Sequence, residues 1–287
     1  MMVLALVVMS ALVGGFAAVA AMARWPSSDP GAPHVDADRT SVEVSRHPRL
    51  AGIVRARLDP RTATGLLLTL AVVLLTLGIG FAGLLLVMVQ THSGFARFDA
   101  GAARFGAAHA TGSSTAVLRL LTQLGGAVVL VPLGVAVAVM GARRSRPVVA
   151  ALFLGVCVLG QFLVANGVKS LVSRARPEVL HLTGYSGSSF PSGHAAAAAA
   201  SFAGFALVLG RGRTRPVRRA LTGVAVGLAI AIAATRVFLG VHWLTDVLAG
   251  LAIGWAWFAA CSIAFGGRLL RFGEPVEVAE ALVQDAR

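Results

Sequence analysis

The chain has 287 residues, of which 57% are hydrophobic, and it carries a formal net charge of +13. Its mean hydropathy is +0.81. Because the apolar residues come in long runs, the composition excludes an ordinary soluble domain and indicates a polytopic membrane protein. In a soluble protein this charge would suggest nucleic acid. Here the basic residues lie between apolar runs, so they favour a role in orienting the chain in a lipid bilayer, and we expect no nucleic-acid partner.

The N-terminal part, residues 1–62, combines an apolar segment with a linker of different composition. Val3–Ala23 is apolar throughout and is predicted to be a transmembrane helix. The alternative is a cleaved signal peptide, since Ala21-Met22-Ala23 resembles a cleavage site, but no Lys or Arg precedes the apolar stretch. Residues 24–61 are rich in Arg and Pro, and we expect a mostly irregular cytoplasmic linker with one short helix at most.

Residues 63–265 contain six further apolar segments, each near the ~20 residues that a helix needs to cross a membrane. We therefore predict an all-α, polytopic membrane bundle with six core transmembrane helices and one extra N-terminal helix. The fourth segment is rich in alanine and is expected inside the bundle. Residues 266–287 are polar and are expected to form a cytoplasmic tail. The six segments are Ala63–Val89, Ala116–Met140, Val148–Val168, His194–Gly210, Ala220–Val237 and Trp243–Phe265.

The distribution of basic residues predicts the orientation of these helices. Alternate loops, taken with the N-terminal linker and the tail, hold 18 of the 25 Lys and Arg residues. Cytoplasmic loops collect positive charge, so this side is predicted to be inside. Residues 91–115 then lie outside and read as an interfacial amphipathic segment, in which His92 and His109 are expected to be exposed loop residues.

Three short polar clusters interrupt the apolar sequence, and all three fall on the predicted outer side. The first runs from Lys169 to Arg176-Pro177 and contains the only lysine of the chain. Because the sequence is so rich in arginine, a lone lysine indicates a position that needs the compact ammonium group of Lys rather than the planar guanidinium group of Arg. If the third core helix continued past the membrane, Lys169 and Arg176 would face one way. An ordinary basic cap at the membrane interface is the alternative.

The second cluster, Pro191-Ser192-Gly193-His194, opens the fourth core helix. Ser192 is a suitable N-cap, and Gly193 lets an oxygen ligand approach the backbone. The free N–H groups at a helix N-terminus favour an anion, and His194 would lie beside it.

The third cluster places His242 and Asp246 four residues apart at the start of the sixth core helix. This spacing allows the carboxylate to orient the imidazole, with Nδ1 a candidate contact atom. Arg236 ends the preceding helix, and Gly240 lets the chain turn back. Each residue alone would more often be structural, but three such clusters at outer helix ends indicate a common site.

Together these clusters resemble the three-part signature of the type 2 phosphatidic acid phosphatase superfamily, in its bacterial membrane lipid phosphatase branch. Thr235 stands where that signature usually has serine. The resemblance implies that His242 is the nucleophile, that Asp246 orients it, and that His194 is the general acid and base. It also implies phosphate binding by a further set of residues, namely Lys169, Arg176, Ser192, Gly193 and Arg236.

The resemblance implies a metal-independent phosphatase of the cell membrane that acts through a phosphohistidine. No carboxylate cluster for a divalent metal is evident, so we expect no cofactor and fixed cations in its place. Cys157 and Cys261 lie in apolar runs and are expected to be buried. The expected substrate is a membrane lipid phosphate at the outer face, with undecaprenyl diphosphate considered first and phosphatidic acid or phosphatidylglycerophosphate also fitting. A lipid phosphotransferase, a transporter and a vanadate-dependent haloperoxidase are the alternatives.

Overall fold

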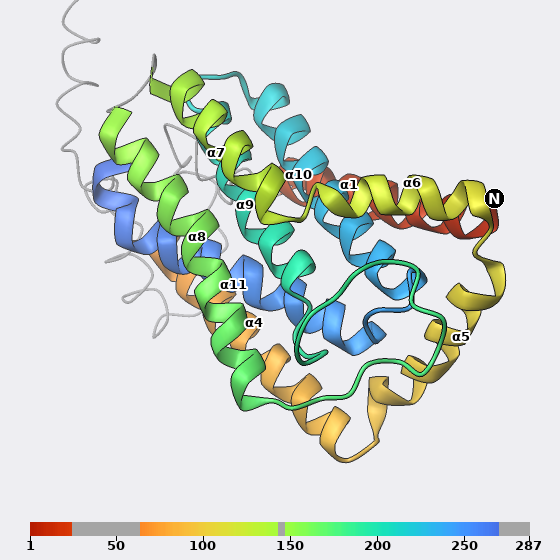
Figure 1. Cartoon of the computed structure of the whole chain (residues 1–287). Coiled ribbons are helices and arrows are strands. Elements are labelled where there is room, and N and C mark those ends of the chain that lie inside the picture. The colour runs from red at the N-terminus through yellow and green to blue at the C-terminus, as the bar shows by residue number, and fades with distance from the viewer. Residues whose placement is uncertain (25–63, 143–146, 270–287) are drawn as a thin grey trace, which may run out of the picture.

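The computed structural model describes residues 1–24, 64–142 and 147–269, and every regular element within these ranges is a helix (Figure 1). The predicted linker beyond Arg24 and the tail from residue 270 lie outside the described residues. In chain order the elements are α1 (Met2–Arg24), α4 (Thr64–Gln90), the 3₁₀-helix η3 (Gly94–Phe98), α5 (Asp99–His109), α6 (Gly112–Gln123), α7 (Ala127–Ala142), α8 (Pro147–Leu171), α9 (Gly193–Gly210), α10 (Arg215–Phe238) and α11 (Leu244–Leu269).

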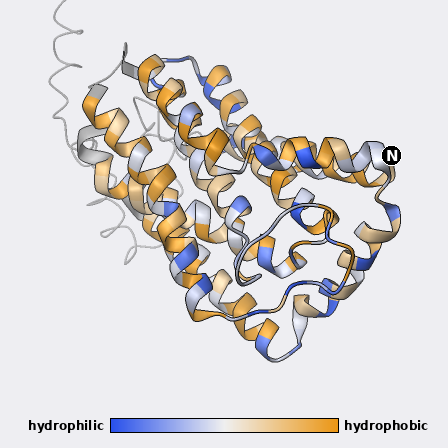
Figure 2. Cartoon of the chain, viewed as in Figure 1, coloured by the Kyte–Doolittle hydropathy of each residue, from blue (hydrophilic) through white to orange (hydrophobic). Residues whose placement is uncertain are grey.

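Six of the described helices are long and apolar enough to cross a membrane: α1, α4, α8, α9, α10 and α11. The pair α6 and α7 provides a seventh span if it counts as one broken helix. Figure 2 shows apolar residues along these helices and hydrophilic residues around the loop of residues 172–192 and at neighbouring helix ends. The predicted all-α, polytopic membrane bundle is therefore confirmed.

The second core segment is not the single helix that the sequence predicts. α6 and α7 are bent by 49° with respect to each other at a short break that contains Gly125 and Gly126. A Cβ at Gly125 would lie 2.6 Å from Ile232 Cγ2 and 3.1 Å from the His194 carbonyl oxygen. The break therefore lets the chain pass close to the start of α9 and to α10, a tertiary requirement that the apolar pattern does not reveal.

The alanine-rich helix α9 lies inside the bundle, as predicted. Its residues 195–200 are all buried, and it packs against α7, α8, α10 and α11. α11 approaches the first turn of α9 closely at Gly250. A Cβ at this position would lie 2.6 Å from the Ser192 carbonyl oxygen. Small residues on both helices thus set the spacing between the second and third polar clusters.

The N-terminal helix α1 is an integral part of the bundle. It packs along α10, and a Cβ at Gly15 would meet the Gly223 carbonyl oxygen at 2.7 Å. At the other end of α1, Val3 and Val7 are buried in a cluster with Leu239. These contacts include the predicted N-terminal helix in the bundle, and its length and apolarity make it a candidate membrane span.

One end of the bundle gathers the segments that carry the polar clusters, and we call it the site end. η3 and α5 lie there as the predicted interfacial segment, and Phe95 and Phe98 are 46% and 63% exposed. His92 and His109 are exposed, as expected. The third core helix, however, ends at Leu171, so the predicted helical continuation to Arg176 is wrong. Residues 172–192 instead form a long loop at the site end (Figure 1).

Candidate active site

The site is built where α8, α10 and the 172–192 loop meet the first turns of α9 and α11. His242 and Asp246 are both buried in it, with exposed fractions of 2% and 0%. His242 Nδ1 lies 3.4 Å from Asp246 Oδ2, so the predicted carboxylate–imidazole contact is present and uses Nδ1. Gly240, at φ 74°, makes the turn that brings His242 back against the end of α10.

This arrangement directs Nε2 of His242 away from Asp246 and toward Arg176. Arg176 Nη1 is 3.4 Å from Nε2, on the side of the ring away from Asp246. Burial lowers the pKa of His242 to about 4, although the hydrogen bond and negative charge of Asp246 act in the opposite direction. A neutral imidazole with a lone pair on Nε2 is therefore the resting form near neutral pH.

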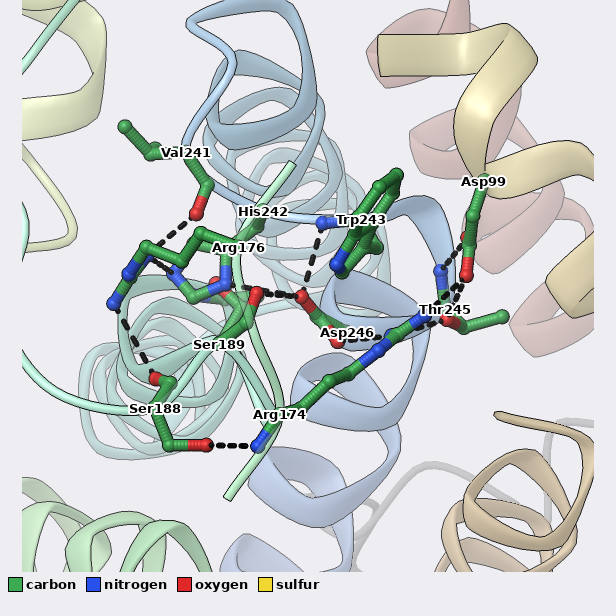
Figure 3. Close-up of polar contacts among 12 residues, drawn as sticks. Asp99, Arg174, Arg176, Ser188, Ser189, Val241, His242, Trp243, Thr245 and Asp246 are labelled. Atoms are coloured by element: carbon green, nitrogen blue, oxygen red, sulfur yellow. Dashed lines mark hydrogen bonds and ion pairs between the residues drawn. The ribbon is translucent and has the colours of Figure 1, made fainter. Parts of the chain in front are cut away.

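Asp246 is held on both carboxylate oxygens (Figure 3). The hydroxyl of Ser189 and the backbone N–H of Trp243 donate to Oδ2, the latter at 2.9 Å. Arg174 Nη1 donates to Oδ1 at 2.5 Å. Charge-assisted bonds of this kind fix the orientation of a carboxylate in a buried setting.

Arg176 lies in the loop rather than on a helix, and it organises the loop around itself. Its guanidinium donates to the carbonyl oxygens of Val241 at 2.5 Å and Ser186 at 2.8 Å. Its Cζ lies 4.6 Å from the centroid of the Tyr185 ring. Burial lowers the pKa of the Arg176 guanidinium from its ordinary value, whereas the charge of Asp246 raises it.

The other two predicted cations have unused hydrogen-bonding capacity. Arg236 is 3% exposed, and its Nη1 donates to Thr122 Oγ1 at 3.1 Å. Its buried Nε has no hydrogen-bond partner among the described residues. Lys169 is half-buried, and within the same ranges its ammonium makes no hydrogen bond or ion pair. Buried donors without partners are costly, so they indicate a site for an oxygen-rich ligand.

The first turn of α9 carries the second polar cluster. Ser192 is the N-cap, and its hydroxyl accepts a hydrogen bond from the Ala195 N–H at 3.5 Å. The Gly193 carbonyl oxygen accepts a bond from Gln161 Nε2 at 3.4 Å. His194 faces the glycine pair between α6 and α7, and the positive charges of Lys169 and Arg236 act on it. The helix N-terminus and the cations together form an anion-binding environment.

Several residues of the site escape sequence reasoning. Asp99, Thr245 and Ser189 hold the network around Asp246, and Thr122 and Gln161 support Arg236 and Gly193. Asp99 could have been noticed as the only acidic residue in the interfacial segment 91–115. Arg174 lies within the first cluster, but the family resemblance assigns phosphate binding to Lys169 and Arg176 and no role to Arg174. Elsewhere in the described ranges, no group of three or more His, Cys, Asp or Glu side chains could hold a metal ion.

These features define the class of protein as an α-helical, multi-pass membrane protein with a cluster of histidine, carboxylate and cationic side chains at one end of its bundle. Residues 150–269 match the PAP2 superfamily. A lipid A 1-phosphatase from Rhizobium etli is 38% identical over 117 residues, which cover 37% of this chain and 46% of the relative. Phosphatidylglycerophosphatase B from Bacillus subtilis is 33% identical over 97 residues, which cover 32% and 46%. The chain thus spans about half the length of the curated relatives that it matches.

The fold has a counterpart among solved structures. The crystal structure of a transmembrane PAP2-type phosphatidylglycerolphosphate phosphatase from Bacillus subtilis superposes with a TM-score of 0.58 and 24% identity. The superposition covers 68% of this chain and 98% of that chain. The similarity to the PAP2 superfamily is thus a family match over residues 150–269, together with a shared helical fold over 68% of the chain.

Proposed function

We propose that the protein is an integral membrane phosphatase that hydrolyses a lipid phosphate or polyprenyl diphosphate through a phosphohistidine. The observation that carries this proposal is the His242 imidazole. Its Nδ1 is 3.4 Å from Asp246, and its Nε2 faces the cationic side of the site. A buried neutral imidazole that is oriented by a carboxylate is a suitable nucleophile.

Binding of the substrate phosphate uses the capacity left open in the site. Lys169, the free Nε of Arg236 and Arg176 neutralise the phosphoryl oxygens, while Ser192 and the Gly193 N–H add hydrogen bonds. Phosphoryl transfer depends mainly on positioning and on stabilisation of the charge that develops on these oxygens. Prearranged cations provide both without reorganisation in the transition state.

In the first chemical step, His242 Nε2 attacks phosphorus. A P–N bond forms, the bond from phosphorus to the leaving oxygen breaks, and protonated His194 gives its proton to that oxygen. The carboxylate of Asp246 stabilises the positive charge that the His242 ring acquires. A general acid of this kind contributes about 10²–10⁴-fold, most for a poor leaving group such as an alkoxide.

In the second step, His194 takes a proton from a water molecule, and the water oxygen attacks the phosphoryl group. The P–N bond breaks, inorganic phosphate leaves, and His242 returns to its neutral form. His194 is then protonated for the next cycle, because the proton that it takes from water replaces the one that it gave to the leaving oxygen.

The substrate is expected to present its phosphate at the membrane interface, because the site lies at helix ends rather than at mid-bilayer. Residues 63–265 form the phosphatase domain in this proposal, with α1 as an additional transmembrane helix and with the linker of residues 24–61 and the tail of residues 266–287 on the cytoplasmic side. The charge bias then makes the site end extracytoplasmic. The matched relatives are named for phosphatases of lipid A and of phosphatidylglycerophosphate, which supports a lipid phosphate as the substrate class.

Purified protein in detergent, incubated with a panel of lipid phosphates and polyprenyl diphosphates, tests the proposal by release of inorganic phosphate. His242→Ala should abolish release, whereas His109→Ala, at an exposed histidine of the same end, should leave it unchanged. Transfer of the phosphoryl group to an added alcohol, without free phosphate, would identify a phosphotransferase instead. An active His242→Ala protein would refute the phosphohistidine route.

A further inference from the structure

We propose that Asp99 is a positioning residue for the reaction, acting on His242 through Arg174 and Asp246. This inference rests on the proposed function, because it concerns the nucleophile of that reaction. Asp99 comes from the interfacial segment, far in sequence from the three polar clusters. Figure 3 shows it at the outer end of a continuous chain of polar contacts that ends at the imidazole.

Asp99 is the first residue of α5, and it is buried, with 3% of its surface exposed. Its Oδ1 accepts from the backbone N–H of Thr245 at 2.9 Å. Its Oδ2 accepts from Thr245 Oγ1 at 2.6 Å and from Arg174 Nη2 at 2.7 Å. Both oxygens therefore point toward the start of α11, next to Asp246, rather than toward α5 itself. A carboxylate that served only its own helix would cap the N–H groups of α5.

Arg174 joins the two carboxylates. Its Nη2 binds Asp99, while its Nη1 binds Asp246 Oδ1 at 2.5 Å and Thr245 Oγ1 at 2.8 Å. Its Cζ also lies 5.4 Å from the centroid of the Trp243 ring. The planar fork of a guanidinium can hold two anions at a defined angle, which an ammonium cannot do. Asp99 thus fixes the plane in which Arg174 meets Asp246.

The contact that orients His242 needs this support. The distance from Asp246 Oδ2 to His242 Nδ1 is 3.4 Å, which is long for a hydrogen bond, so a small rotation of the carboxylate would break it. Ser189 and Trp243 hold Oδ2, and Arg174 is the side chain that holds Oδ1, so its bond opposes that rotation. A nucleophile must be held within a fraction of an ångström of its line of attack, and a misplacement of 1 Å can cost about 10²-fold in rate.

The test compares Asp99→Asn with Glu178→Gln, a matched loss of carboxylate charge at an exposed position of the 172–192 loop. Asparagine keeps the shape but puts a donor where Arg174 or Thr245 donates. We expect kcat for phosphate release to fall about tenfold to a hundredfold in Asp99→Asn, with KM within about twofold of wild type. Glu178→Gln should keep both values.

Arg174→Lys provides a second variant that does not touch Asp99, and it keeps the positive charge. It should lose kcat to a similar degree, because an ammonium cannot bridge the two carboxylates. Combined with Asp99→Asn, it should lower kcat little beyond the single variants, since residues of one chain of contacts are not additive. Additive losses, or an Arg174→Lys protein with full kcat, would overturn the inference.

The readouts also separate positioning from simple anchoring of α5. An anchor predicts lower thermal stability with an unchanged kcat per folded molecule, and that result would overturn the inference. If wild type turns over and Asp99→Asn has the same kcat, only the positioning role of Asp99 fails. If wild type and Glu178→Gln release no phosphate from any lipid of the panel, the proposed function is refuted, and so is this inference, which depends on it.

Discussion

Replacement of Gly250 by alanine should impair the site without changing any polar residue in it. The added Cβ would lie 2.6 Å from the Ser192 carbonyl oxygen and 3.0 Å from Ala195 Cβ. Ordinary contact begins at 3.4 Å, so the first turn of α9 must retreat by about 0.8 Å, the difference between 3.4 and 2.6 Å. Ser192, Gly193 and His194 would move away from His242 by a similar amount.

The expected consequence is a loss of kcat of about tenfold to a hundredfold, on the scale of 10²-fold for a 1 Å misplacement. Overpacking should also cost about 1–3 kcal/mol of stability. Initial rates of phosphate release and thermal unfolding in the same detergent measure the two effects. Gly155→Ala is the control, because a Cβ there meets nothing within 4 Å. A Gly250→Ala protein that matches Gly155→Ala in both measurements would refute the reasoning.

Three further predictions concern the histidines, pH and orientation. His194→Ala should slow cleavage of a lipid phosphate far more than it reduces the first burst of nitrophenolate from an aryl phosphate, because nitrophenolate leaves without a proton. His242→Ala should give no burst with either substrate. The reverse pattern would mean that the two histidines exchange roles. His242 has a pKa of about 4 in the folded protein against about 6.5 unfolded, so the unfolded state takes up the proton first as pH falls through this window. Stability should then drop by up to about 3 kcal/mol between pH 6.5 and 4, and equal slopes for wild type and His242→Gln in thermal unfolding would contradict this. In intact cells, an impermeant thiol reagent should label a cysteine at Ser188 but not one at Arg215 in a background without the native cysteines, and the opposite result would reverse the orientation.

Much of the fold and the central site were predictable because their signals are local. Runs of about 20 apolar residues indicate helices wherever they occur, and the N-cap role of Ser192 follows from its place before an alanine run. The four-residue spacing of His242 and Asp246 likewise predicts their contact. Each of these predictions depends on residues that are close together in the chain.

The missed features depend on contacts between distant segments. The hydrogen bond from Arg174 to Asp99 joins residues that are 75 positions apart, and no local sequence pattern around either residue predicts the contact. The break at Gly125 interrupts a continuous apolar pattern because α9 and α10 approach there. Arg176 leaves the helical path because the carbonyl groups of a loop surround its guanidinium, whereas helical periodicity alone would have placed it in line with Lys169.

The packing of α1 on α10 has a consequence for the order in which the bundle assembles. α1 ends at Arg24 and its partner begins at Arg215, so synthesis completes the first helix long before its docking surface exists. Until then the glycine-lined face of α1 lacks its partner helix, and closing so long a loop is slow. Val3 and Val7 bury themselves against Leu239 and Val241, the residues that lead into His242. His242 therefore gains its final surroundings only when α1 joins α10, a helix that is synthesised almost 200 residues later.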